Sequence, residues 1–239
     1  MKTPNHSTSR VVADRSPHSR RNFLRKSGFG IAAASLFLAG CDDDDTPPIM
    51  PDNAVNLGSG DIGVLNYAFA LEQLEAAFYQ TVLQGGYFSS ADADEQQVMR
   101  DLEAHERAHV EFLNTAISSV GTAIPALEVD FSSIDFDSRD SVLATAQTFE
   151  DLGVSAYNGA GRLLSDANYL LAAGKIVSVE ARHAAVIRTL RSNGSPTAFA
   201  NDDVVDDNGL DVVRTPSEVL AMAGAFVVTE IDASGLPTQ

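Results

Sequence analysis

Two short motifs in the chain combine residue types that could bind a metal ion. Glu106-Arg107-Ala108-His109 and Glu180-Ala181-Arg182-His183 each place a glutamate three residues before a histidine. In a helix, residues at this spacing lie on one face with Cβ atoms about 5 to 6 Å apart. The carboxylate and the imidazole of each motif could therefore bind one cation together. One such motif is weak evidence, but two in one chain predict a pair of related sites.

Two further glutamates extend the pattern to both halves of the chain. Glu72 precedes Tyr79 by seven residues, and Glu150 precedes Tyr157 by the same spacing. Seven residues are about two helical turns, so each tyrosine is expected near the glutamate of its own helix. Each half then reads as one Glu followed by a Glu-x-x-His motif, which is an internal repeat. The tyrosines could hydrogen-bond metal ligands or transfer electrons, and plain core packing is an equal alternative.

Together these residues predict a site for two metal ions. Carboxylates buried in a helical core without a cation would each be strongly destabilising, and bound metal removes that penalty. Oxygen and imidazole ligands without sulfur suit Fe or Mn, and Zn is also compatible. The expected cofactors are therefore two Fe or two Mn ions. The predicted ligands are Glu72, Glu106, His109, Glu150, Glu180 and His183.

Three neighbouring side chains compete with this ligand set. Glu75 lies one turn after Glu72 and could replace it, but no tyrosine follows Glu75 by seven residues, which favours Glu72. Glu103 and His105 flank the first Glu-x-x-His motif. Because His105 lies about 100° around the helix from the neighbouring motif glutamate, a surface position is predicted for it.

Four amphipathic segments are expected to position these residues. Their apolar side chains recur at spacings of three and four residues, and Gly, Pro or Asn follows most of them. The predicted helices cover about Asp61 to Gly85, Ala91 to Val120, Asp140 to Leu164 and Asp166 to Ser192, with Asp61 as the first N-cap. The connections are short, long and short, and the long one spans about 121–137. This pattern predicts an all-α four-helix bundle with one long crossover between the second and third helices.

The segment Leu71-Glu72-Gln73-Leu74-Glu75-Ala76-Ala77-Phe78-Tyr79, taken with the two Glu-x-x-His motifs, resembles the ferritin-like superfamily. The resemblance covers roughly residues 61–192 and is closer to exported bacterial and desiccation-related members. It implies that the six residues are ligands, with Glu106 and either Glu150 or Glu180 bridging the metals. It also implies an oxidoreductase acting on Fe(II), dioxygen or peroxide, either a ferroxidase or a catalase-like enzyme. The alternative is a non-catalytic metal-binding or structural stress protein at the cell envelope.

The first 41 residues resemble an export signal followed by a lipid attachment site. Arg20 and Arg21 precede an apolar run, Gly28 to Gly40, that is too short for a permanent membrane span. This layout resembles the twin-arginine signal, and Leu38-Ala39-Gly40-Cys41 resembles a bacterial lipobox. Lipidated Cys41 would anchor the protein to the outer face of the cytoplasmic membrane, which is the periplasmic side in a cell with two membranes.

Charge is unevenly distributed along the chain. Seven of the 16 Lys and Arg residues precede Cys41, but only one of the 33 Asp and Glu residues does. The acidic remainder would repel phosphate backbones, which argues against nucleic acid as a partner. The expected partners are metal ions, the twin-arginine export machinery, the membrane and a second copy of the chain in a homodimer. The predicted organisation is an export signal (1–41), a flexible linker (42–60), a bundle (61–193) and a loop-rich extension with one short helix (194–239).

Overall fold

The computed structural model describes residues 54–238. Arg20, Arg21 and Cys41, which carry the predicted export and lipidation signals, lie outside the described residues, as does the predicted linker up to residue 53. Among the described residues, no helix is both long and apolar enough to cross a membrane.

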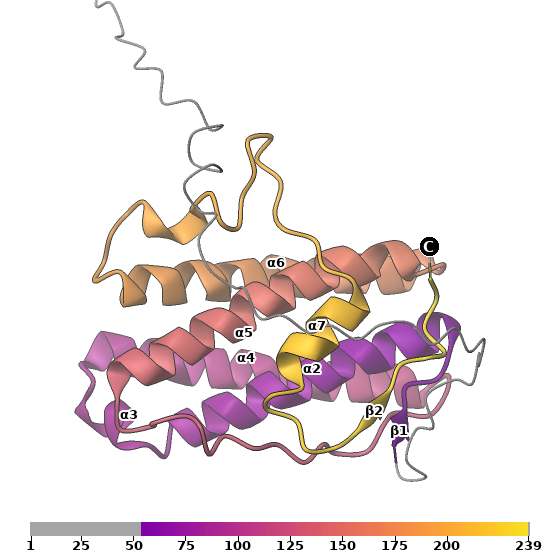
Figure 1. Cartoon of the computed structure of the whole chain (residues 1–239), viewed down its shortest axis with the longest axis horizontal. Coiled ribbons are helices and arrows are strands. Elements are labelled where there is room, and N and C mark those ends of the chain that lie inside the picture. The colour runs from indigo at the N-terminus through magenta and orange to yellow at the C-terminus, as the bar shows by residue number, and fades with distance from the viewer. Residues whose placement is uncertain (1–53, 239) are drawn as a thin grey trace, which may run out of the picture. The chain divides into compact units, whose positions relative to one another are not determined.

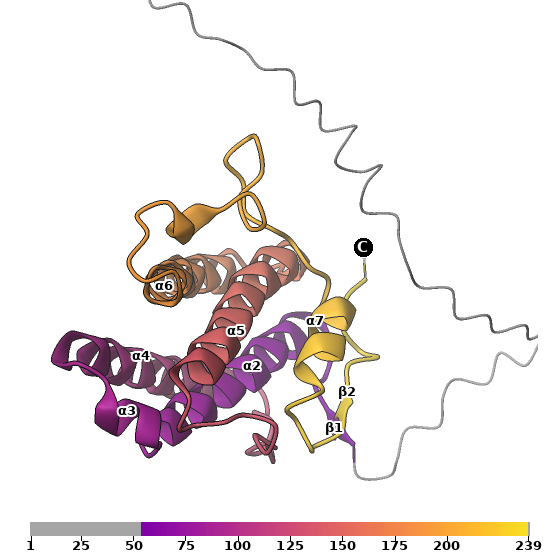
Figure 2. The same ribbon diagram turned by 60° about the vertical axis from the view of Figure 1, so that its left-hand side comes forward.

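Four long helices make up most of the described region, as Figures 1 and 2 show from two directions. Their bounds are α2 (Gly60–Val82), α4 (Ala93–Ser118), α5 (Arg139–Ala160) and α6 (Ala167–Arg191). α2 packs mainly against α4, and α5 packs mainly against α6. The four predicted helices are thus present, with ends shifted by a few residues.

The segment 119–138 connects the two helix pairs along the length of α2. At its start, Gly121 approaches the side chain of Ile62 in the first turn of α2. At its end, the carbonyl of Phe136 accepts a hydrogen bond from the backbone N–H of Tyr87, which lies just beyond α2. The long crossover is therefore confirmed, and with it the all-α four-helix bundle architecture.

Side-chain caps define the start of three of these helices. Asp92, Ser138 and Asp166 each accept a hydrogen bond from a backbone N–H in the first turn of α4, α5 and α6. The prediction that Asp61 caps the first helix is wrong, because α2 begins one residue earlier with Ser59 at the N-cap. The Asp61 carboxylate instead accepts backbone hydrogen bonds from residues 165 and 166, which ties the start of α2 to the α5–α6 connection.

Buried polar side chains connect the loops to this core. The amide of Asn66, in α2, donates to the carbonyls of Leu57 and Thr122 and accepts from the N–H of Ile124. Burying these backbone groups without partners would be destabilising, so Asn66 fixes where the crossover starts on α2. At the far end, Arg139 pairs with Glu95 through contacts as short as 2.8 Å and links α5 to α4.

The chain on either side of the bundle is more ordered than the sequence predicts. The sequence predicts a flexible linker up to residue 60, but β1 (Val55–Asn56) pairs in parallel with β2 (Ile231–Asp232) and Leu57 is fully buried. The predicted C-terminal helix, about Pro216 to Val228, is shorter in the structure, where α7 covers Pro216–Ala223. Three short elements were not predicted from the sequence: α3 (Gly86–Ser90), η1 (Gly161–Leu163) and η2 (Ala198–Ala200).

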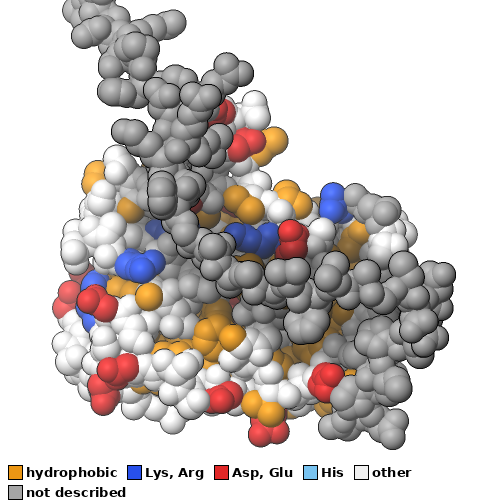
Figure 3. Space-filling model, in the orientation of Figure 1, with side chains coloured by type: hydrophobic (Ala, Val, Ile, Leu, Met, Phe, Trp, Pro, Cys, Tyr) orange, Lys and Arg blue, Asp and Glu red, His pale blue; other side chains and the backbone are white. Residues whose placement is uncertain are grey.

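Acidic side chains are spread over the visible surface in Figure 3, with few Lys and Arg between them.

Candidate metal centre

Each of the four long helices contributes at least one carboxylate to the centre of the bundle. α2 contributes Glu72 and α5 contributes Glu150, while α4 and α6 each contribute a Glu-x-x-His motif. The carboxylates of Glu72, Glu106, Glu150 and Glu180 are fully buried. The histidines differ, because the side chain of His109 is 13% exposed and that of His183 only 5%.

These side chains form two groups that could each hold a cation. We call the group Glu72, Glu106, His109 and Glu180 the His109 position, and the group Glu106, Glu150, Glu180 and His183 the His183 position. In each, one ligand atom per residue lies within 4.8 Å of all the others. Glu106 and Glu180 belong to both groups and could bridge two cations. The structure therefore brings together all six predicted ligands. Of Glu150 and Glu180, the two candidates for the second bridging ligand, only Glu180 belongs to both groups.

The polar atoms in this centre are close together but poorly hydrogen-bonded. Nδ1 of His183 lies 2.7 Å from Oε1 of Glu106, yet both atoms lack a hydrogen-bond partner because the angles are unsuitable. One carboxylate oxygen of Glu150 and both oxygens of Glu180 are likewise buried without a partner. Buried polar atoms are normally satisfied, so a cluster whose lone pairs converge without hydrogen bonds fits bound cations. The donor set, carboxylate oxygens and imidazole nitrogens, suits Fe, Mn or Zn.

Without metal, the two histidines would balance part of the negative charge. Burial lowers the pKa of His109, but the adjacent carboxylates of Glu106, Glu180 and Glu72 outweigh it and raise that pKa to about 12. The pKa of His183 is raised for the same reason. Burial raises the pKa of Glu106, but the two histidines outweigh it and lower that pKa to about 2. The metal-free centre is therefore held together by imidazolium–carboxylate pairs, whose protons a metal must displace.

The two tyrosines contact the centre across the bundle, which corrects the sequence prediction. Tyr79 of α2 donates a hydrogen bond of 2.5 Å to Glu150 of α5, and Tyr157 of α5 donates to Glu72 of α2. Each tyrosine therefore bonds the glutamate of the other half of the repeat rather than that of its own helix. The reason is geometric: two turns separate Glu and Tyr along one helix, whereas neighbouring helices bring the opposite residues level.

Glu75 lies beside the centre but outside both groups. It is 4% exposed, and neither group includes it, whereas Glu72 lies 3.1 Å from Nδ1 of His109. Space for Glu75 comes from Gly153 in α5, since a Cβ there would lie 3.0 Å from Oε1 of Glu75 and 3.6 Å from Oε2 of Glu180. Burial, and next the charges of Glu180 and Glu150, raise the pKa of Glu75 well above its usual range.

His105 is exposed, as the sequence predicts, but its ring reaches the centre. Nδ1 of His105 lies 3.0 Å from Nε2 of His183, and the two rings are parallel to within 5°. With Nε2 occupied in this way, Nδ1 of His183 faces the carboxylates. This contact could not be predicted from the sequence, because it joins α4 to α6 and no local pattern indicates which residues meet between two helices.

One pocket opens beside the centre. It has a volume of about 350 Å³ and lies between α4 and α6. It is lined by His109, Phe112, Asn168, Leu171, Ala172, Lys175, Ile176 and Val179. Phe112 is 49% exposed and Leu171 is 61% exposed, so the pocket is open to solvent and its wall is largely apolar. A small molecule in this pocket would contact the ring of His109.

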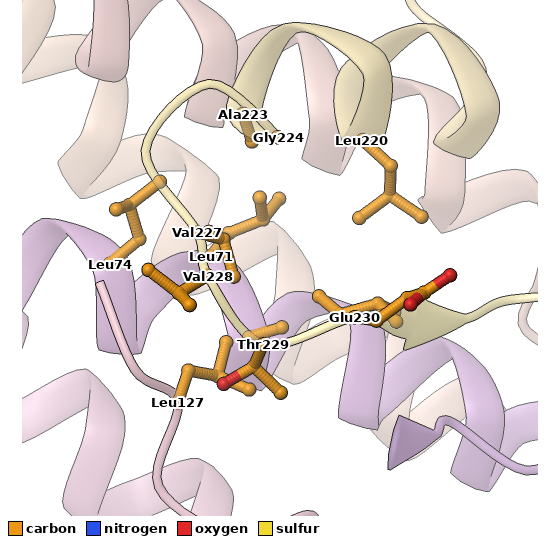
Figure 4. A pocket seen from close by; sticks show the side chains of 12 residues that line it. Leu71, Leu74, Leu127, Leu220, Ala223, Gly224, Val227, Val228, Thr229 and Glu230 are labelled. Carbon is orange, nitrogen blue, oxygen red and sulfur yellow. The ribbon is translucent and has the colours of Figure 1, made fainter. Parts of the chain in front are cut away.

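A second pocket, of about 370 Å³, lies away from the carboxylates. Figure 4 shows Leu71 and Leu74 of α2 on one side and Val227 and Val228 of the C-terminal segment close to them. None of the residues that line it belongs to either metal-binding group. This pocket marks where the C-terminal segment covers α2 and is not part of the candidate centre.

The comparison with known families agrees with this architecture. A family model described as a ferritin-like domain matches residues 60–193, which is more than half of the chain and includes all four long helices. No curated protein matches the chain significantly. On the strength of the family match, the chain belongs to the ferritin-like domain family.

Proposed function

We propose that this protein binds two Fe or Mn ions and uses them as an oxidoreductase that acts on Fe(II), dioxygen or peroxide. The observation that carries the proposal is the convergence of six side chains into two groups that share Glu106 and Glu180. The family match is consistent with it but names no activity.

The metal ligands, the two tyrosines and the pocket beside His109 would have different roles in this function. Glu106 and Glu180 would bridge the two metals, and the remaining ligands would hold one metal each. Tyr79 and Tyr157 hold Glu150 and Glu72 in place by donating hydrogen bonds to them. The bound metals would supply electron transfer to or from a small oxidant. The apolar wall of the pocket beside His109 would restrict water near the centre while admitting a small molecule.

Metal content is the decisive measurement. We expect about two Fe or Mn ions per chain in protein purified from its native source, and loss of both in a Glu106→Ala/His183→Ala variant. Glu111→Ala is the matched control, because Glu111 lies on the same helix as Glu106 but is 69% exposed. Fe(II) oxidation and peroxide consumption by the loaded protein would then identify the reaction. Absence of metal from the unmodified protein would overturn the proposal, whereas two tightly bound metals without turnover would support the non-catalytic alternative.

We also propose that the chain is exported by the twin-arginine route and anchored through lipid on Cys41. The support is the sequence itself: a pair of arginines, a short apolar run and a lipobox-like Cys41 follow one another. An Arg20→Lys/Arg21→Lys variant should remain unprocessed in the cytoplasm, and Cys41→Ser should abolish incorporation of labelled fatty acid. Export of the double-lysine variant at the normal rate would contradict the route. Unlabelled wild-type protein would contradict the anchor.

A further inference from the structure

The repeat relates the two halves of the chain, but three features distinguish their metal positions. The halves match in their ligands, since each supplies one Glu and one Glu-x-x-His motif. The differences lie around these ligands, in a hydrogen-bond partner, in an extra carboxylate and in access to solvent.

The first difference is a hydrogen-bond partner for one histidine only. His105 precedes Glu106 and lies within hydrogen-bonding distance of His183. The equivalent residue in the other half precedes Glu180 and is Val179, which cannot hydrogen-bond His109. A partner on the outer nitrogen of a ligating histidine fixes its orientation and raises its basicity, which increases metal affinity.

The second difference is an additional carboxylate. Glu75 follows Glu72 by three residues, and the equivalent residue after Glu150 is Gly153. These two repeat-related residues face each other, and the carboxylate of Glu75 lies where a side chain at Gly153 would otherwise be. Among the described residues, none hydrogen-bonds Glu75, and its strongest charged neighbours are Glu180 and Glu150, both of the His183 position. A buried carboxyl group beside this position could serve as a further ligand there.

The third difference is access. His109 lines the open pocket between α4 and α6, whereas His183 does not line it and is less exposed. Solvent and small ligands can therefore reach a metal at the His109 position more readily.

We propose that the two metal positions are inequivalent. The His183 position, with His105 holding its imidazole and Glu75 beside it as a fifth carboxylate, binds a divalent transition-metal ion more tightly. The His109 position, open to the pocket, is the exchangeable one, where a small substrate meets the metal. This inference rests on the proposed dimetal centre and specifies the role of each half.

Co(II) is a suitable probe, because its absorption spectrum reports coordination and its anomalous scattering locates it in crystals. With one equivalent of Co(II), we expect occupancy mainly at the His183 position. Calorimetric titration of the metal-free protein should show two steps whose affinities differ by about tenfold or more. Glu75→Gln and His105→Phe should each weaken the tight step by about 10- to 100-fold and alter its spectrum, while the weak step changes little. Glu103→Gln, on α4 but in neither group, is the control.

The possible failures are distinguishable. Equal occupancy of both positions at one equivalent, or a tight step unchanged in both variants, would overturn the inference while leaving the dimetal centre intact. Failure of the unmodified protein to bind any Co(II), Fe(II) or Mn(II) would instead overturn the proposed function. A spectral change in Glu75→Gln without unfolding would show that Glu75 influences the coordination of the tightly bound cobalt, which supports the inference.

Discussion

Replacing Glu75 by Gln should stabilise the metal-free protein, and the gain should depend on pH. Burial and neighbouring carboxylates raise the pKa of Glu75 well above its ordinary value of 4.5. For a carboxyl group with a raised pKa, folding stability is fully present below pH 4.5. It is lost as the pH rises toward the folded-state pKa, because only the unfolded state releases the proton. Gln has nearly the shape of the protonated carboxyl group but carries no such penalty.

The size of the effect follows from the pH interval. If the folded carboxyl keeps its proton at pH 7, the penalty is about 1.4 kcal/mol for each pH unit above 4.5, or at most roughly 3.4 kcal/mol. For a domain of this size, 1 kcal/mol corresponds to about 2 to 4 °C in Tm. Glu75→Gln should therefore raise Tm by up to roughly 10 °C at pH 7 and leave it nearly unchanged at pH 4.5.

Thermal unfolding followed by circular dichroism, in chelator and across pH 4.5 to 7.5, measures this difference. Glu111→Gln is the matched control, because Glu111 is exposed and pairs with Arg107 on the surface. Its effect should stay within about 0.5 kcal/mol at every pH. A Glu75→Gln variant that is less stable than the unmodified protein at pH 7, or equally stabilised at both ends of the range, would refute the electrostatic reasoning.

Three other predictions test the packing and the metal centre. Gly159→Ala places a Cβ 1.7 Å from the carbonyl oxygen of Arg214, so the free energy of unfolding measured in urea should fall by about 1 to 3 kcal/mol. Gly174→Ala is the control, because its Cβ has no neighbour within 4 Å, and the free energy of unfolding should stay constant or rise by up to about 1 kcal/mol. Equal effects of the two substitutions would contradict this packing. Tyr157→Phe removes the hydrogen bond to Glu72 and should weaken metal binding about 10- to 100-fold in calorimetry, whereas unchanged affinity would assign the tyrosine to packing alone. Because both ligand histidines have raised pKa values without metal, metal binding should release protons. Metal affinity should therefore rise about 10- to 100-fold per pH unit near neutrality. Calorimetric binding heats that do not vary with the ionisation enthalpy of the buffer would contradict this prediction, because they would show that no proton is released.

The four long helices and the shared faces of their motif residues could be predicted from the sequence. Helical periodicity is local, so the spacing of Glu106 and His109 places both on one face whatever lies opposite. The crossover followed from the lengths of the connections, and the six candidate ligands followed from the repeat. The ends of the elements were less predictable, as residues 54–60 show, because pairing with β2 depends on a segment far away in the sequence.

The contacts between the helices were decided only in the tertiary structure. The repeat aligned Tyr79 with Glu72, but packing paired Tyr79 with Glu150, because the relative height of two helices depends on all the side chains between them. Glu75 and its repeat counterpart Gly153 were both visible in the sequence, yet only the packed bundle showed that they face each other. The sequence alone thus determined which motif residues share a helix face, through local helical geometry. The tertiary structure decided which of them meet, because contacts across the bundle depend on the packing of distant segments.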